Sequence, residues 1–200
     1  MPPKAKYTRE EIVETAFRMA REKGIESVVA RELGKELGTS SSPIFTAFKN
    51  MEELQEEVRK RAMSEFESYI GDATDYTPAF KYVGMRMVEF ATKEPKLFQL
   101  LFLSSKDGDK GYSILLNKLG SFMSFCVDII QKEHDITKEE AELLFQQTWL
   151  HTFAICVLVA GKICTLSLEE ISHMLSIEFQ GTLMLIKSGG YSEIQVRKLK

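Results

Sequence analysis

Apolar residues recur every three or four positions along nearly the whole chain, which is the period of an α-helix. In the first such segment Ile12, Ala16 and Ala20 share one side of a helical wheel, and Thr8 and Glu11 have the spacing of a capping box. No segment shows the alternation that is typical of a strand. The pattern predicts an all-α protein of about nine helices, over residues 8–24, 31–37, 41–48, 50–70, 77–94, 95–104, 112–132, 137–162 and 167–187.

Two of these helices are short and are joined by a tight turn. Leu33 and Leu37 share one side of the first of them. Gly38 can take the left-handed conformation that ends a helix, and the hydroxyl groups of residues 39–41 can cap the next one. Together with the helix over residues 8–24, this arrangement predicts a three-helix unit that contains a helix-turn-helix.

The second short helix has an apolar side and a hydroxyl-bearing side. Ile44 and Phe48 lie on the apolar side, whereas Ser42, Thr46 and Lys49 lie opposite. A helix packed through one side can lie in a major groove, where hydroxyl groups bond to base edges and a lysine binds phosphate. The same spacing also fits an ordinary helical hairpin whose serines are merely solvated.

Residues 7–60 resemble the signature of the tetracycline-repressor (TetR) family of bacterial transcription regulators. The helix from Arg9 to Gly24 matches the family pattern. So do the segments Arg31-Glu32-Leu33-Gly34-Lys35-Glu36-Leu37-Gly38-Thr39-Ser40, Ile44-Phe45, Phe48-Lys49-Asn50 and Glu52-Glu53-Leu54. The resemblance implies a dimer that binds a palindromic double-stranded operator and responds to a small-molecule effector.

The resemblance also implies which residues contact DNA. Carried over position by position, the contacts fall on Val29, Arg31, Ser40, Ser41, Ser42, Pro43, Phe45, Thr46 and Lys49. Position 45 is usually a tyrosine whose hydroxyl meets a phosphate, and Phe45 lacks that hydroxyl. The family often has histidine at position 46, tyrosine at 47 and threonine at 29, where this chain has Thr46, Ala47 and Val29. The operator sequence therefore does not follow by analogy.

The last two long helices are the candidate dimer interface. Residues 143–161 carry no formal charge, but the polar Gln146, Gln147 and His151 interrupt them. We interpret this segment as a helix buried on nearly all sides rather than a membrane span. A pair of such helices from each subunit forms a four-helix bundle. The predicted interface residues are Leu150, Val157, Gly161, Ile171, Leu175, Phe179 and Leu183.

The middle helices are rich in aromatic residues, which suit the lining of an apolar effector cavity. Aromatic residues at helical spacing also form plain core, and that alternative stays open. Gly84 and Gly120 each cost about 1 kcal/mol relative to alanine inside a helix, which indicates close packing or free space. The candidate cavity residues are Tyr82, Phe90, Phe98, Phe102, Phe122, Phe125, Phe145, Trp149, His151, Thr152 and Phe153.

The charge distribution agrees in sign with DNA binding. The chain has a net charge of −3, but residues 1–61 carry 12 basic and 11 acidic side chains, or +1, and residues 62–200 carry 14 and 18, or −4. Lys4, Lys6 and Arg9 precede or open the first helix, where they can contact phosphates. Three cysteines and a polar N-terminus without a secretory signal indicate the reducing cytoplasm.

The sequence offers little that would support catalysis. His134, His151 and His173 are isolated from other metal ligands, and no glycine-rich phosphate loop is present. We therefore expect neither an enzyme nor a cofactor or metal site.

Taken together, these features predict a transcription regulator with a helix-turn-helix domain over residues 1–50, a connecting helix over 51–70, and an effector-binding and dimerisation domain over 71–200. The turn-rich residues 71–75 mark the boundary. Repression, relieved by a small and largely apolar effector, is the mode that the resemblance implies. The alternative is a helical interaction protein whose long apolar helices bind another protein, with weak or no specific DNA binding.

Overall fold

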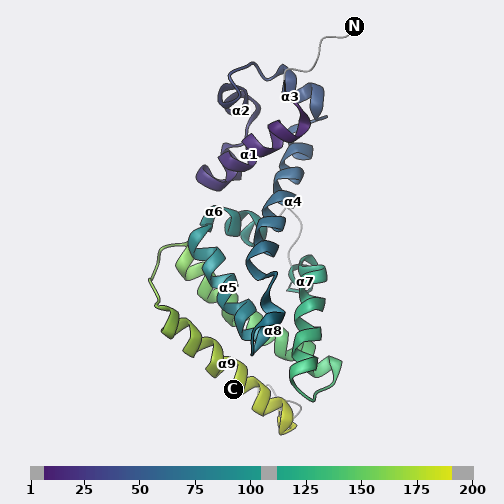
Figure 1. Ribbon diagram of the computed structural model, residues 1–200, viewed down its shortest axis with the longest axis vertical. Coiled ribbons are helices and arrows are strands. Elements are labelled where there is room, and N and C mark those ends of the chain that lie inside the picture. The colour runs from purple at the N-terminus through teal and green to yellow at the C-terminus, as the bar shows by residue number, and fades with distance from the viewer. Residues whose placement is uncertain (1–6, 105–111, 191–200) are drawn as a thin grey trace, which may run out of the picture. The chain divides into compact units, whose positions relative to one another are not determined.

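The computed structural model describes residues 7–104 and 112–190, and of residues 112–118 only the backbone. Within these ranges the chain contains helices and no strand, which confirms the all-α prediction. Lys4 and Lys6, the candidate phosphate contacts before the first helix, lie outside the described residues. The helices are α1 (Arg9–Lys23), α2 (Ala30–Glu36), α3 (Ser42–Ala47), α4 (Met51–Ile70), α5 (Ala79–Lys93), α6 (Pro95–Phe98), α7 (Tyr112–Glu133), α8 (Lys138–Ala160) and α9 (Leu168–Lys187) (Figure 1).

Three of the long helices begin with a capping box. Thr8 with Glu11, Thr137 with Glu140, and Ser167 with Glu170 each exchange two side-chain to backbone hydrogen bonds. These bonds join residues only three apart, so the sequence spacing was sufficient to predict them.

The start of α4 departs from this pattern. Asn50 Oδ1 accepts from the Glu53 N–H at 2.9 Å, as in a capping box. The Glu53 carboxylate, however, accepts from the N–H of Lys49 at 2.8 Å rather than from that of Asn50. This bond lowers the pKa of Glu53, and the Arg9 guanidinium lowers it further. The turn between α3 and α4 is thereby tied to the first turn of α4.

By its internal contacts the chain forms two compact units. The first unit contains the described residues up to Tyr69 and those from Phe90 to Ser104, and the second contains Ile70 to Glu89 and residues 112–190. The end of α5 and all of α6 therefore pack with the helix-turn-helix and α4. The assignment of functions to residues 1–50, 51–70 and 71–200 stays a prediction.

Apolar stripes from several helices form the core of the first unit. Ile12, Ala16 and Phe17 of α1 are buried with Leu33 of α2 and Ile44 of α3. On α4, every fourth residue from Leu54 to Phe66 is buried, which adds Leu54, Val58, Ala62 and Phe66 to this core. An aromatic cluster completes this core, with Phe90 and Phe102 both edge-on to Phe66 at centroid distances of 5.2 and 5.3 Å.

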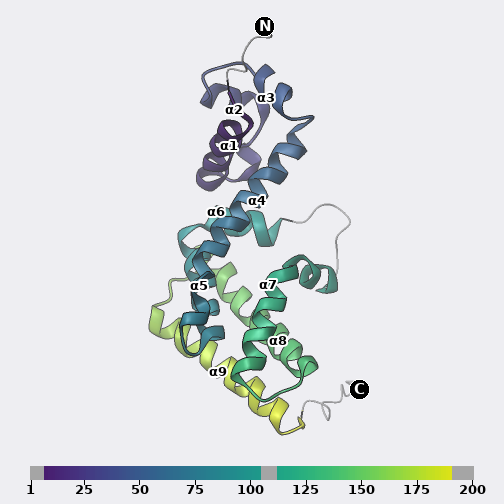
Figure 2. The same cartoon turned by 45° about the vertical axis from the view of Figure 1, so that its right-hand side comes forward.

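A carboxylate with little solvent access joins the end of α1 to the start of α6. Arg21 Nε donates to Glu94 Oε2 at 2.8 Å, and its Nη2 pairs with Glu94 Oε1 and lies 3.7 Å from Glu65. The hydrogen bond to Glu94 raises the pKa of Arg21. Because Glu94 is only 8% exposed, its charge depends on this guanidinium for compensation. The two helices pack together at this point (Figure 2).

We expect Arg21→Met to lower the free energy of unfolding by about 1.5–3 kcal/mol, the usual worth of hydrogen bonds to charged groups. The loss of unfolding free energy should lie toward the lower end of this range because Arg21 is accessible to solvent. The double variant Arg21→Met with Glu94→Leu should recover most of the lost free energy, since no buried charge is then left unpaired. Urea unfolding followed by far-ultraviolet circular dichroism measures the free energy of unfolding of both variants. Equal losses in the single and double variants would contradict this account.

In the second unit, α8 packs between α7 and α9. Leu144, Phe145, Trp149 and Ile155 of α8 are buried in this core. Among the described helices, α8 alone is long and apolar enough to cross a membrane. The core helix of a soluble domain can have the same length and composition.

The two glycines singled out in the sequence serve different purposes. At Gly84 a Cβ atom would lie 3.1 Å from Leu175 Cδ1, so its absence lets α5 approach α9 closely. At Gly120 the backbone has φ 41° and ψ −118°, a conformation that is strained for any residue with a side chain. The two parts of α7 accordingly run in different directions (Figure 2).

Candidate nucleic-acid interface and ligand cavity

Helix α3 is held by one side and exposed on the other. Ile44 and Phe48 are buried in the first unit, whereas Ser42, Thr46 and Lys49 are exposed. Phe45, between the two sides, is 51% exposed. The orientation is the one that the helical period predicts, and it leaves the hydroxyl-bearing side free to meet a duplex.

Hydrogen bonds within α3 decide what its hydroxyl groups can offer. Thr46 Oγ1 lies 3.0 Å from the Ser42 carbonyl oxygen and donates its hydrogen to it. In this state Thr46 therefore offers lone pairs and a methyl group, but no hydrogen, to a base edge. Ser41, at the N-cap position, makes no side-chain capping bond, and Ser40 Oγ instead accepts from the Ser42 N–H at 3.4 Å.

The turn between α2 and α3 is compact because of two glycines. Gly38 has φ +66°, in the left-handed region, as expected for the residue after a helix. At Gly34 a Cβ atom would lie 3.1 Å from the Thr39 carbonyl oxygen, so the glycine lets the turn fold back closely over α2. The Thr39 N–H donates to the Gly34 carbonyl at 2.8 Å and closes the turn.

The structure gives Arg9 a different role from the phosphate contact that its position suggested. Its Nη1 donates to the Ala47 carbonyl at 2.8 Å, and its Nη2 lies 3.0 Å from Glu53. The guanidinium also lies over the Phe48 ring, 4.0 Å from the centroid. Arg9 is therefore engaged within the protein, where it fixes the C-terminal end of α3 against α1 and α4.

The remaining candidate DNA contacts surround α3. Val29 and Arg31, at the start of α2, are exposed, as is Ser40 in the turn. Ser41 and Pro43 are partly buried at the start of α3. The structure thus brings all the candidate residues to α3, the turns on either side of it, and the start of α2.

A cavity of about 170 Å³ lies in the second unit, between α5, α7, α8 and α9. Of the residues predicted from the sequence, Phe122, Phe145, Trp149, His151 and Thr152 line it. The prediction missed most of the lining from α5, the end of α7 and α9, which includes Phe80, Val83, Glu133, His134 and Glu178. Their spacing along the chain does not show that these helices meet.

The other candidate cavity residues lie elsewhere. Phe90 and Phe98 are buried in the core of the first unit, and Phe102 packs beside them, because that part of the chain folds against α4. Tyr82 stacks on Tyr76, with the two ring centroids 3.8 Å apart. Phe153 stacks on the ring of Trp149, and Phe125 is partly buried on α7; neither lines the cavity.

The candidate interface residues on α8 and α9 also divide into two groups. Ile171, Leu175 and Leu183 are buried within the protomer, and Phe179 lines the cavity. Leu150 and Gly161 are exposed, and Val157 is partly buried.

Three large apolar residues absent from that prediction, Leu158, Ile177 and Met184, are exposed on the same two helices as Leu150. We define the α8–α9 face as Leu150 and Leu158 of α8 with Ile177 and Met184 of α9, all of them exposed. Helices α8 and α9 are antiparallel neighbours (Figure 1). His151 of α8 and Glu178 of α9 face each other, with His151 Nδ1 4.0 Å from Glu178 Oε2. Leu150 and Ile177 each immediately precede one of these two residues. In an antiparallel pair of helices, both side chains therefore point to the same side.

Two of the three cysteines, Cys126 and Cys156, are buried. Burial raises the pKa of the Cys126 and Cys156 thiols, which makes them poor nucleophiles. In the part of the chain that the structure describes, no group of three or more His, Cys, Asp or Glu residues is placed to hold a metal ion.

Comparison with known proteins agrees with this arrangement. The family model for bacterial regulatory proteins, tetR family, matches residues 12–58. This match assigns the helix-turn-helix region to the TetR family. The match covers α2, α3 and every candidate DNA contact, which supports DNA binding by this region. TetR-family regulators are generally not enzymes.

Solved structures of transcriptional regulators share the fold of most of the chain. A TetR-like transcriptional regulator from Rhodococcus sp. RHA1 is 15% identical, with a TM-score of 0.64 over 92% of this chain and 99% of that one. A second regulator from Rhodococcus sp. RHA1 is 15% identical, with a TM-score of 0.62 over 89% and 97%. Thermus thermophilus FadR, a TetR-family repressor in complex with lauroyl-CoA, is 15% identical, with a TM-score of 0.53 over 96% and 97%. No curated protein sequence matches the chain.

Proposed function

We propose that this protein is a cytoplasmic, dimeric repressor that binds a palindromic operator through α3 and leaves it when a small, largely apolar effector occupies the cavity. The observation that carries the proposal is the anchoring of α3. Ile44 and Phe48 hold it from one side and Arg9 holds its end, while Ser42, Thr46 and Lys49 are exposed. Such a helix can enter a major groove without rearrangement.

A dimer would present two copies of α3 to one duplex. For a twofold dimer, the two half-sites of the operator lie about one helical turn apart, roughly 34–36 Å, or a multiple of it. The α8–α9 face supports the proposal, because exposed apolar side chains on two adjacent long helices suit a four-helix bundle with a second copy.

Helix α5 offers a route from the cavity to the DNA-binding helices. Val83, Gly84 and Met87 line the cavity. One turn further along the same helix, Phe90 packs edge-on against Phe66 of α4. An effector that prefers one position of α5 would therefore bias α4, and operator affinity would change by a shift in population. That FadR binds lauroyl-CoA supports a ligand site in a protein of this fold.

Two substitutions test the roles of the residues on α3. Lys49→Ala should weaken binding to all DNA sequences alike, because a phosphate contact carries no sequence information. Thr46→Ala should instead lose about 1–3 kcal/mol of discrimination at one base pair. Mobility-shift titrations against an operator and its single-base variants measure both, beginning with the DNA upstream of the protein's own gene.

A matched variant separates the two groups of the Thr46 side chain. Thr46→Val keeps a methyl group and lacks the hydroxyl, so it retains discrimination only if the methyl contacts a thymine. The reverse pattern, with Thr46→Ala weakening all sequences and Lys49→Ala changing specificity, would overturn the roles assigned to α3.

A further inference from the structure

The cavity in the second unit gathers polar atoms that have no partner among the described residues. Four buried side-chain atoms lack a hydrogen-bond partner among the described residues: Glu133 Oε2, His134 Nε2, Trp149 Nε1 and His151 Nε2. All four belong to residues that line this cavity. A buried polar group without a partner is costly, so the gathering of all four at one cavity indicates a ligand that supplies the missing bonds.

The chemistry of these atoms specifies what the ligand must carry. Trp149, only 2% exposed, has an indole N–H that can only donate, so it requires an acceptor. The Glu133 carboxylate can only accept, so it requires a donor. Its other oxygen accepts from the Ala79 N–H at 2.6 Å, which holds the carboxylate at the start of α5. Burial lowers the pKa of His134, and the neutral ring can either donate or accept.

The size of the cavity suits a ligand of about one ring. The rings of Phe80, Phe122, Phe145, Phe179 and Trp149 contribute to the lining. An apolar protein cavity of about 150 Å³ is known to hold benzene, and this cavity measures about 170 Å³. A ring with small substituents fits this volume.

Charge decides between an anionic and a cationic ligand. The lining contains Glu133 and Glu178 against a single lysine, Lys81. Two carboxylates beside aromatic faces favour a cation and repel an anion.

We propose that the cavity binds a single aromatic ring that carries an alkylamine, with the protonated amine donating to Glu133 and an acceptor on the ring receiving the Trp149 N–H. The inference rests on the proposed function in taking this cavity as the effector site. It deepens that proposal by naming the class of effector: the body of the ligand is apolar, but a positively charged amine at one end selects it.

Three compounds that differ in one group test the inference: 4-(aminomethyl)phenol, p-cresol and 4-hydroxybenzoate. Isothermal titration calorimetry of the full-length protein without DNA measures their binding. We expect the amine to bind about 10- to 100-fold more tightly than p-cresol, the ratio typical of one hydrogen bond to a charged group, and the carboxylate to bind most weakly. Equal binding of the amine and p-cresol, tighter binding of the carboxylate, or no binding of any of the three would overturn it.

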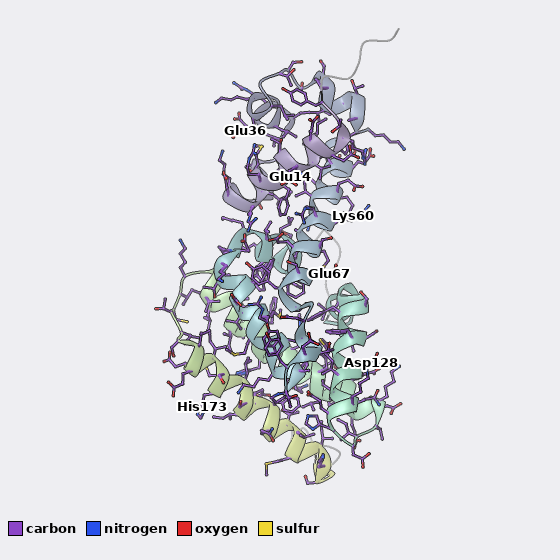
Figure 3. All side chains as sticks on the ribbon, viewed as in Figure 1. Glu14, Glu36, Lys60, Glu67, Asp128 and His173 are labelled. Atoms are coloured by element: carbon purple, nitrogen blue, oxygen red, sulfur yellow. The ribbon has the colours of Figure 1, made fainter. Side chains whose placement is uncertain are left out.

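Two variants assign the contacts. Glu133→Gln keeps an oxygen for the Ala79 N–H but removes the charge, so it should abolish the preference for the amine over p-cresol. Trp149→Phe keeps an aromatic ring but loses the N–H, so it should weaken all three phenols by a similar factor. The control is Asp128→Asn on the exposed side of α7, outside the cavity, which should change neither (Figure 3). A preference for the amine that survives Glu133→Gln would overturn the assignment.

Operator binding is measured separately on the same protein. A protein that binds its operator but none of the three compounds overturns this inference and leaves DNA recognition through α3 intact. A protein that binds the amine but no operator overturns the proposed function instead.

Discussion

Operator binding is expected to weaken by about 10³ to 10⁵ when the salt concentration rises from about 50 to 200 mM, if the dimer contacts about six to ten phosphates. Each neutralised phosphate releases counterions, so the logarithm of the affinity falls linearly with the logarithm of the salt concentration. Arg31, Lys35 and Lys49 are exposed on α2 and just after α3, and they form no ion pair with the described residues. Three such cations in each protomer make six in a dimer, the lower end of this range.

Fluorescence anisotropy of labelled operator DNA at four salt concentrations gives the slope of the logarithm of affinity against the logarithm of salt concentration. Lys60→Ala is a suitable control, because Lys60 lies on the exposed side of α4 and pairs with Glu57 at 3.1 Å (Figure 3). It should leave the slope unchanged, whereas Lys49→Ala should reduce its magnitude by about one for each phosphate that the variant no longer neutralises. An affinity that does not respond to salt would rule out the binding of phosphates by these residues.

A charge placed on the α8–α9 face is expected to dissociate the dimer and lower operator affinity by about 10²- to 10⁴-fold, the usual gain from two linked binding sites. Ile177→Asp is the sharpest test, because Ile177 is 61% exposed in the protomer. The aspartate is solvated in a monomer, so the fold should survive, but a dimer would bury its charge without a partner. His173, four residues earlier, marks the same side of α9 in Figure 3.

Analytical ultracentrifugation measures this effect as a shift from twice the protomer mass to the 22.8 kDa protomer. Leu168→Asp is the matched control: Leu168 is 71% exposed on the same helix, but nine residues, or half a turn, away from Ile177. It should leave the dimer intact. If the wild-type protein already sediments as a monomer, the α8–α9 face belongs to another partner, as in the interaction-protein alternative.

The sequence by itself determined the features that depend on neighbouring residues. Capping boxes join residues three apart, and the two sides of α3 follow from the helical period, so Thr8, Ile44 and Thr46 could be interpreted from their spacing alone. The helix-turn-helix signature is equally local, because the glycines of the turn and the apolar positions of α2 and α3 lie within a short stretch of chain.

The tertiary structure decided which helices meet, and with it the contents of each site. Phe90 and Phe80 look alike in the sequence, yet one packs on α4 in the first unit and the other lines the cavity. Arg9 was expected at a phosphate but binds Ala47 and Glu53, both about 40 residues away. These contacts depend on distant segments coming together, and the period of a single helix shows only which side is buried and not what it is buried against.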